Sequence, residues 1–231
     1  MALILNIETS TNVCSAAISK NGEVIDLLEN FDDRSHASLL TVFIEKLFKQ
    51  NNLNYSHLDA VSISEGPGSY TGLRIGVSVA KGICYAQNKP LIAINTLKAM
   101  AMMAKETISD LPTNALLCPM IDARRMEVYS AVFDTNLNGI RKTIAEVIEE
   151  NAYQTELQNN PIYFFGNGSS KCKEKITHNN AIFSNEIYPS AKYMARLSQT
   201  AFGSNDFKDA AYFEPFYLKD FVATTSKKKA W

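Results

Sequence analysis

The chain has 231 residues, of which 46% are hydrophobic, and its formal net charge is −1. This length suits one large domain or two lobes with a sizeable core. The near-neutral charge disfavours a protein that grips nucleic acid alone, and Lys227-Lys228-Lys229 is typical of a solvated tail. The four cysteines are far apart. No apolar stretch reaches the roughly 20 residues of a membrane span, so a soluble cytoplasmic protein is expected.

The first part of the chain alternates apolar strand patterns with helical ones. Strands are predicted over residues 3–7, 13–20, 23–30, 58–64 and 91–95, and helices over 35–50, 72–87 and 96–107. Asn21-Gly22 is the strongest short signal for a hairpin, since both turn positions need positive φ. A strand, a helix and a strand in succession predict a parallel pair with a right-handed crossover. This lobe is therefore expected to be a mixed sheet with helices on its faces.

A lobe boundary is predicted at residues 108–112, which gives an N-terminal lobe of residues 1–107 and a compact C-terminal lobe of residues 108–231. After this boundary the pattern partly restarts, without a tandem repeat. Strands are predicted over residues 116–121, 126–133 and 162–165, and helices over 169–177 and 190–203. The last residues are expected to return to the first lobe or to lie near it.

The segment Gly66-Pro67-Gly68-Ser69 joins a predicted strand to a predicted helix. Glycines at such a junction let backbone N–H groups face an anion, so a phosphate loop is one interpretation. A tight turn that starts a helix uses the same residue types, and both interpretations stay open. Thr9 and Ser10 end the first strand, where hydroxyl groups either face a phosphate or complete a turn.

The helix after this loop carries small residues at Gly72, Gly76, Ala80 and Gly82. Each interior glycine costs roughly 1 kcal/mol relative to alanine, which indicates that another backbone comes close. Apolar residues spread around most of this helix, and the helix over 35–50 also has an excess of them. The two helices are predicted either to lie deep in this chain's own core or to dock on another subunit.

Other segments carry weaker signals. Asp122-Ala123-Arg124-Arg125-Met126-Glu127 packs opposite charges into a strand-turn-strand segment, which favours a salt-bridged turn over a carboxylate pair for acid–base work. None of the three histidines has a second histidine at a metal-ligand spacing. Ser69 lacks the sequence context of a serine hydrolase.

Several segments, in order along the chain, together resemble the TsaB family, also called YeaZ. They are Leu3-Ile4-Leu5-Asn6-Ile7-Glu8-Thr9-Ser10, residues 66–76, Ala80-Lys81-Gly82, Asn95-Thr96-Leu97, Asp122-Ala123-Arg124 with Glu127-Val128-Tyr129, and Pro215-Phe216-Tyr217-Leu218-Lys219. The glycine-rich segment and the segment beginning at Asp122 are highly specific in combination. Departures from the pattern are mild: Glu8 stands where aspartate is usual, and Lys219 where arginine is usual.

The resemblance implies an α/β protein of the two-lobed actin-like ATPase fold (ASKHA, ribonuclease H-like), with a mixed sheet and helices in each lobe. It also implies a role in making N6-threonylcarbamoyladenosine beside the anticodon of tRNAs that read codons beginning with A. In that family the catalyst is the paralogue TsaD, and TsaB is its dimerisation partner. TsaE joins the complex, TsaC supplies threonylcarbamoyl-adenylate, and a homodimer is expected when TsaD is absent.

Laid on this chain, the two metal-binding histidines of TsaD fall on Thr96 and Met100. Neither residue is a good ligand for a hard divalent or iron centre, so a pseudo-enzyme without a metal is expected. Gly166-Asn167-Gly168 is the nearest segment to an adenosine-binding Gly-Gly motif, and it is a weak match. No cofactor is expected to bind firmly to this chain alone, and ATP or ADP at a subunit boundary stays an open alternative.

The predicted partner-binding residues lie on the two apolar helices. They are Leu40, Phe43, Leu47, Gly72, Leu73, Gly76, Val79, Ala80 and Ile83. A vestigial phosphate loop is expected from Thr9, Ser10, Gly66, Gly68 and Ser69. The alternative functions are a nucleotide-binding ATPase or phosphotransferase of the actin-like class and, after an old family label, a glycopeptidase.

Overall fold

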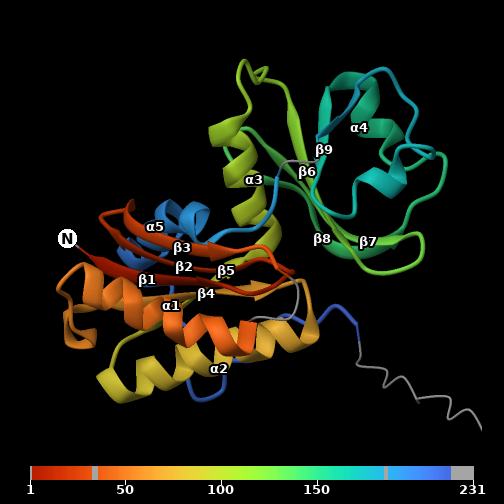
Figure 1. Cartoon of the computed structure of the whole chain (residues 1–231). Helices are drawn as coiled ribbons and strands as arrows, with labels where there is room; N and C mark the ends of the chain where they lie inside the picture. Colours follow the sequence, from red (N-terminus) through yellow and green to blue (C-terminus); the bar gives the residue numbers. More distant parts are fainter. Residues whose placement is uncertain (1, 33–35, 185–186, 220–231) are drawn as a thin grey trace, which may run out of the picture.

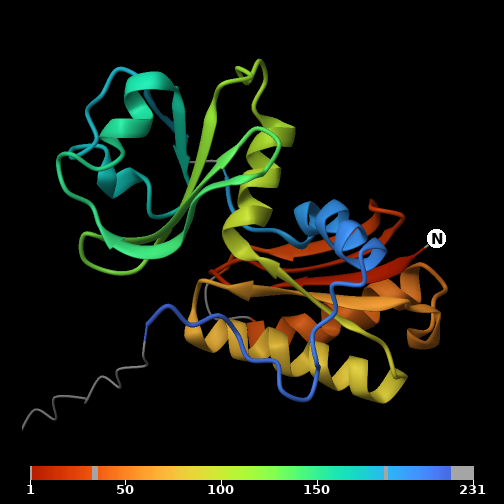
Figure 2. The same ribbon diagram turned by 180° about the vertical axis from the view of Figure 1, so that it is seen from behind.

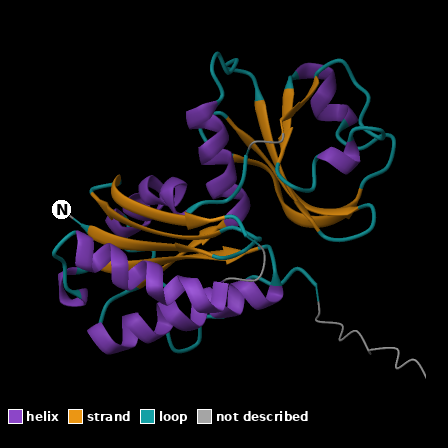
Figure 3. Cartoon of the chain, in the orientation of Figure 1, coloured by secondary structure: helices purple, strands orange, loops and turns teal. Residues whose placement is uncertain are grey.

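The computed structural model describes residues 2–32, 36–184 and 187–219, which form two lobes joined side by side (Figure 1). The first lobe is built on a five-stranded sheet in the order β3-β2-β1-β4-β5, and the second on a five-stranded sheet in the order β10-β9-β6-β7-β8. Helices lie against both sheets (Figure 3). The strands of the first sheet are β1 (Leu3–Glu8), β2 (Cys14–Lys20), β3 (Glu23–Asn30), β4 (Ala60–Gly66) and β5 (Leu91–Asn95). Those of the second are β6 (Leu116–Asp122), β7 (Glu127–Asp134), β8 (Gly139–Val147), β9 (Ile162–Phe165) and β10 (Ala181–Ser184).

The two sheets repeat one topology. In each, the first three strands pair antiparallel in succession, and the fourth strand pairs parallel with the first and with the fifth. The expected hairpin between β2 and β3 is confirmed: Asn21 and Gly22 have φ of 55° and 82°. Both values lie in the left-handed region that a tight two-residue hairpin turn needs. The expected parallel pairing of β4 and β5 is also confirmed.

Two long helices, α1 (His36–Gln50) and α2 (Tyr70–Gln87), cover one face of the first sheet. Their apolar side chains pack in a single cluster against the inward face of β1, which includes Leu5 and Ile7. The short 3₁₀-helix η1 (Tyr55–His57) follows α1. Among the described residues, none of the helices combines the length and apolar character that a membrane crossing requires.

The opposite face of the first sheet is covered by residues from the far end of the chain. Ile4 and Ile92 pack there against Met194, at the end of the 3₁₀-helix η3 (Ala191–Met194), and against Leu197 in α5 (Ala195–Gly203). Figure 2 shows α5 on the side of the sheet away from α1 and α2. The backbone N–H of Phe216 then donates to the carbonyl of Glu65 at the end of β4, 2.7 Å away. The first lobe is therefore built from both ends of the sequence, so residues 108–231 do not all belong to the second lobe.

The helix α3 (Thr96–Thr107) serves both lobes. Ala99 packs with Ile4 and Ile92 of the first sheet. Leu97 and Met103 pack with Leu117 and Phe133 of the second sheet, and other residues of α3 join the same cluster. The helix α3 thus contributes side chains to the cores of both lobes and connects the two lobes where they meet.

The second lobe differs most from the sequence-based prediction. The helix predicted over residues 169–177 is wrong: the structure has only a 3₁₀ turn, η2 (Ser170–Cys172). Most side chains in that segment are polar, and only Cys172 and Ile176 belong to the adjacent core, so there is no apolar stripe to hold a longer helix. Three elements were not predicted: β8, β10 and the short helix α4 (Gln154–Asn159).

Candidate functional site

A cleft of about 1240 Å³ lies between the two lobes. Its walls come from four parts of the chain that the sequence keeps far apart. They are residues 10–12 after β1, the loop and first turn at 67–72, the β6–β7 hairpin with Asn167, and residues 216–219. Four of the segments that carry the resemblance therefore meet at one site.

The wall from the first lobe is a tightly packed turn. The N–H of Ser69 donates to the carbonyl of Ser10 at 2.6 Å, and the Ser69 hydroxyl accepts the N–H of Gly72 at 3.3 Å, which caps α2. The hydroxyl of Thr9 donates to the carbonyl of Gly72 at 2.8 Å. These bonds fix the start of α2 on the end of β1.

The glycines of this turn are required by that packing. A Cβ atom on Gly68 would lie 2.1 Å from the carbonyl oxygen of Ser10, and one on Gly72 would lie 2.1 Å from that of Thr9. The fold class implies a nucleotide, whose phosphates would need open space and free N–H groups at such a loop. Here the N–H of Ser69 is already bonded to the carbonyl of Ser10 and that of Gly72 to the Ser69 hydroxyl, so these two donors are not free for a phosphate.

Glu8 lies beneath the turn and is fully buried. Burial raises the pKa of its carboxyl group above the ordinary value, although the polar groups of Ser10, Ser64 and Thr9 around it act in the opposite direction. One carboxyl oxygen accepts the N–H of Ser10 at 2.5 Å. Glu8 therefore holds the segment that supports the loop, and it has no surface in the cleft.

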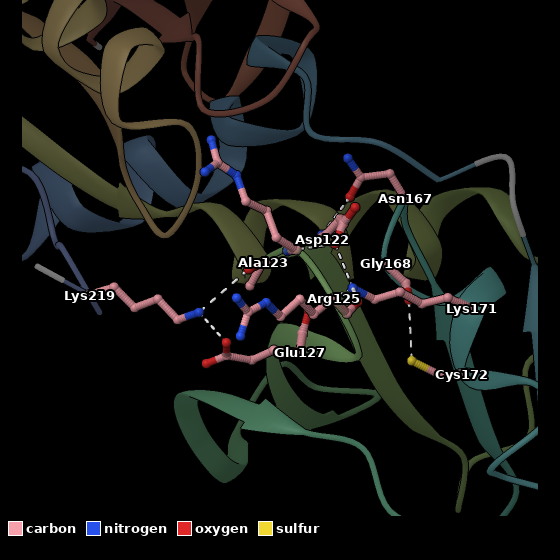
Figure 4. A network of polar contacts seen from close by, with 10 residues as sticks. Asp122, Ala123, Arg125, Glu127, Asn167, Gly168, Lys171, Cys172 and Lys219 are labelled. Carbon is pink, nitrogen blue, oxygen red and sulfur yellow. Dashed lines mark hydrogen bonds and ion pairs between the residues drawn. The ribbon is translucent and has the colours of Figure 1, made fainter. Parts of the chain in front are cut away.

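The wall from the second lobe is the tip of the β6–β7 hairpin (Figure 4). Lys171 stabilises the hairpin by three hydrogen bonds. The Nζ of Lys171 donates to Asp122 Oδ1 at 2.5 Å and to the carbonyls of Arg125 and Glu127 at 2.7 Å each. The N–H of Asp122 donates to Asn167 Oδ1 at 2.9 Å. Burial alone would raise the pKa of Asp122, but the hydrogen bonds from Lys171 and the Arg124 N–H lower it below its ordinary value.

The end of the described chain crosses from one lobe to the other. The ring of Tyr217 lies 5.0 Å from that of Tyr70 at the start of α2. Two residues later, Lys219 Nζ forms an ion pair with Glu127 and donates to the carbonyl of Ala123 at 3.4 Å (Figure 4). The charged turn expected at residues 122–127 is thus confirmed as salt-bridged, but its partners Lys171 and Lys219 come from distant segments that the sequence did not reveal.

The two positions that correspond to the metal-binding histidines lie in the interior. Thr96 and Met100 have exposed fractions of 0% and 1%. Met100 belongs to the apolar cluster that α3 forms with the second sheet, and its methyl group lies 2.5 Å from where a Cβ on Gly166 would stand. Within the described ranges, no group of three histidine, cysteine, aspartate or glutamate residues could hold a metal ion.

The structure corrects most of the predicted partner-binding set. Leu40, Leu47, Leu73 and Ala80 are buried in this chain's own core, so their side chains cannot line a surface. Gly72 and Gly76 are also buried, and the groups that come close to them are the carbonyl and hydroxyl of Thr9. Only Phe43, Val79 and Ile83 of the set are half-buried, at the outer edge of the core formed with α1 and α2. Val42, outside the predicted set, is 51% exposed.

Comparisons with known proteins agree with this architecture. The family model described as TsaD, tRNA N6-adenosine threonylcarbamoyltransferase, matches residues 30–227. The Haemophilus influenzae tRNA threonylcarbamoyladenosine biosynthesis protein TsaB is 31% identical over 95% of this chain and 94% of its own length. The Escherichia coli TsaB is 33% identical over 59% of this chain and 57% of its own. The solved structure of YeaZ from Pseudomonas aeruginosa superposes with a TM-score of 0.82 at 22% identity, covering 94% of this chain and 100% of that one.

The repeated topology and the helix shared between two sheets define an actin-like, two-lobed protein. The chain belongs to the TsaB (YeaZ) family of tRNA threonylcarbamoyladenosine biosynthesis proteins.

Proposed function

We propose that this chain is a non-catalytic partner subunit of TsaD, required for N6-threonylcarbamoyladenosine formation beside the anticodon of tRNA. The observation that carries the proposal is the burial of Thr96 and Met100 in the core of this family member. At the positions where the resemblance places the metal-binding histidines of TsaD, this chain has packed side chains. Its activity would then come from assembly with TsaD in the cytoplasm. TsaE would join that assembly, and TsaC and tRNA would be linked to it functionally.

The outer surface of α1 and α2 is the proposed docking face. Val42 is half-exposed, and the half-buried Phe43, Val79 and Ile83 add apolar surface to the same pair of helices. Apolar surface of this kind is typical of protein–protein contacts. The same face would pair two copies of the chain when TsaD is absent, so the homodimer and the heterodimer would compete.

The test is co-expression with TsaD and reconstitution of tRNA modification. Val79→Arg with Ile83→Arg is expected to abolish co-elution with TsaD and to reduce modification in parallel. Because both side chains are half-buried, the arginines can extend into solvent, and circular dichroism should show a retained fold. Ile144→Arg on β8, at a residue that is 37% exposed, is the matched control and should change neither readout.

Two outcomes would contradict the proposal. Co-elution of the folded double variant with TsaD would exclude the docking face. Modification of tRNA by TsaD, TsaE and TsaC at full rate without this chain would exclude the partner role. The alternative of an independent ATPase gains no support from the loop at residues 66–69, because the Ser69 N–H at its end is already bonded to the carbonyl of Ser10.

A further inference from the structure

The tip of the β6–β7 hairpin presents two consecutive arginines to the cleft. Arg124 and Arg125 have φ of 72° and 50°, a left-handed conformation that arginine seldom adopts. Both residues are exposed, and both line the cleft. In the part of the chain that the structure describes, neither guanidinium group makes a hydrogen bond or an ion pair.

The two carboxylates near these arginines are already paired. Asp122 is bound by Lys171, and Glu127 is bound by Lys219. The charges of the two lysines balance those of the two carboxylates, so Arg124 and Arg125 leave the tip with a net positive charge. This cleft therefore carries a local concentration of positive charge, although the net charge of the whole protein is −1.

The hairpin is also held rigidly enough to act as a site. Lys171 bonds the carbonyls on either side of the turn, and Asp122 accepts the N–H of Arg124 at 2.8 Å. Because the backbone is fixed by these bonds, a ligand that binds the two side chains has to order the side chains and not the turn. A guanidinium group offers paired N–H donors that match the oxygens of a phosphate.

The facing wall adds aromatic surface. Tyr70 and Tyr217 lie with ring centres 5.0 Å apart and both line the cleft, as does Tyr129. Aromatic rings beside arginines are the combination that binds a base together with its phosphate. We propose that Arg124 and Arg125 form a phosphate-binding subsite on the second lobe, which holds phosphate groups of either a nucleotide or an RNA backbone in the cleft.

This subsite goes beyond the partner role and is distinct from the loop at residues 66–69. In the first lobe the N–H groups of Ser69 and Gly72 are bonded within the turn, whereas on the second lobe the arginines extend from a hairpin tip with exposed side chains. The site would select for phosphate through charge and geometry, and the tyrosines would favour a ligand that carries a base.

The test uses the full chain, alone and in complex with TsaD, with three probes: pyrophosphate, ATP and a labelled tRNA anticodon stem-loop. Arg124→Ala with Arg125→Ala is expected to weaken binding at least about 10-fold, because both charge-assisted contacts to phosphate are lost. If the subsite holds the phosphates of an RNA backbone, only the affinity for the stem-loop falls in the arginine variant. The slope of log affinity against log salt concentration then becomes shallower by about 2. If the subsite holds the phosphates of a nucleotide, the affinity for ATP falls in the arginine variant. In the wild type, ATP then displaces the stem-loop weakly or not at all.

The matched control removes two exposed lysines away from the cleft, Lys20→Ala with Lys142→Ala, and should leave the affinity for every probe within about 2-fold. Co-elution with TsaD must survive in the arginine variant, which separates loss of this subsite from loss of the partner role. The proposal is overturned if the arginine variant binds all three probes as the wild type does. It is equally overturned if the wild type, alone and with TsaD, binds none of them at millimolar concentration.

Discussion

The carbonyl oxygen of Thr9 lies 2.1 Å from the point where a Cβ atom on Gly72 would stand. This contact explains why a glycine stands at position 72, where the first turn of α2 packs on the end of β1. Gly82 of the same helix has no atom within 4 Å of its Cβ position, so the two glycines have different roles.

We predict that Gly72→Ala and Gly82→Ala change stability in opposite directions. The first forces backbone atoms apart and should lower the free energy of unfolding by about 1–3 kcal/mol. The Gly82→Ala change removes the entropy cost of a glycine at an exposed helix position. It should raise the free energy of unfolding by about 0.5–1 kcal/mol. Urea denaturation of both variants and the wild type measures the difference, and equal effects would show that Thr9 does not restrict Gly72.

Glu8→Gln should change how stability depends on pH. Burial raises the folded-state pKa of Glu8 above 4.5, so the folded chain retains a proton that the unfolded chain loses as the pH rises past 4.5. The contribution of Glu8 to the free energy of unfolding is therefore fully present below pH 4.5. It is lost as the pH rises through the pKa that Glu8 has in the folded chain. Glutamine keeps an acceptor for the Ser10 N–H and carries no proton to lose.

The measurement is the melting temperature of both proteins at pH 5 and at pH 8. The melting temperature of the variant relative to that of the wild type should be higher at pH 8 than at pH 5. The change should be about 2–4 °C for each 1 kcal/mol of stability that the wild type loses through Glu8. Glu8→Asp, which still titrates, is the control and should keep the wild-type slope. A melting-temperature difference that is constant across this range would show that Glu8 has an unperturbed pKa.

The ion pair between Lys219 and Glu127 should contribute little to stability. Both side chains are partly exposed, with exposed fractions of 37% and 25%, so water screens their attraction. A double-mutant cycle with Lys219→Ala and Glu127→Ala should give a coupling free energy of about 0.2–1 kcal/mol, smaller still in high salt. A coupling free energy well above that range would mean that the last described residues hold the lobes together.

The four thiols should resist alkylation in the folded protein. Cys14, Cys84, Cys118 and Cys172 are all buried. Desolvation raises the pKa of Cys84 to about 11 and that of Cys14 to about 11, and it also raises the pKa of Cys118. Because the thiolate is the reactive form, iodoacetamide at pH 8 should label none of them within the time that labels all four in urea. Rapid labelling of one cysteine in the native protein would identify a segment that opens locally.

The first lobe followed from the sequence because its signals are local. The Asn21-Gly22 turn, the apolar residues of β1 and β4 and the helical spacing in α1 are each signals from residues close together in the chain. The second lobe was less predictable, since β8 is a half-exposed edge strand with mixed polarity and β10 has only 4 residues. Its repeat of the first topology became visible only through strand pairing.

The candidate site shows the same division. The sequence identified the loop at residues 66–69 and the charged turn at 122–127 but could not bring them to one cleft. The lysines that hold the turn lie 49 and 92 residues away from their carboxylate partners. For α2, the small residues correctly indicated a close backbone, but the sequence could not show that this backbone was Thr9 of the same chain and not a partner's.

The return of residues 191–203 to the first sheet sets the order in which the molecule can be completed during synthesis. The face of the sheet that contains Ile4 and Ile92 is covered by Met194 and Leu197, which are translated near the end. The nascent first lobe thus carries an uncovered apolar face while the second lobe is being made. Domains generally fold from the N-terminus as they emerge, but here the second lobe can close before the first. This chain therefore depends on protection of that apolar face from aggregation until residues 191–203 have been made and can cover it.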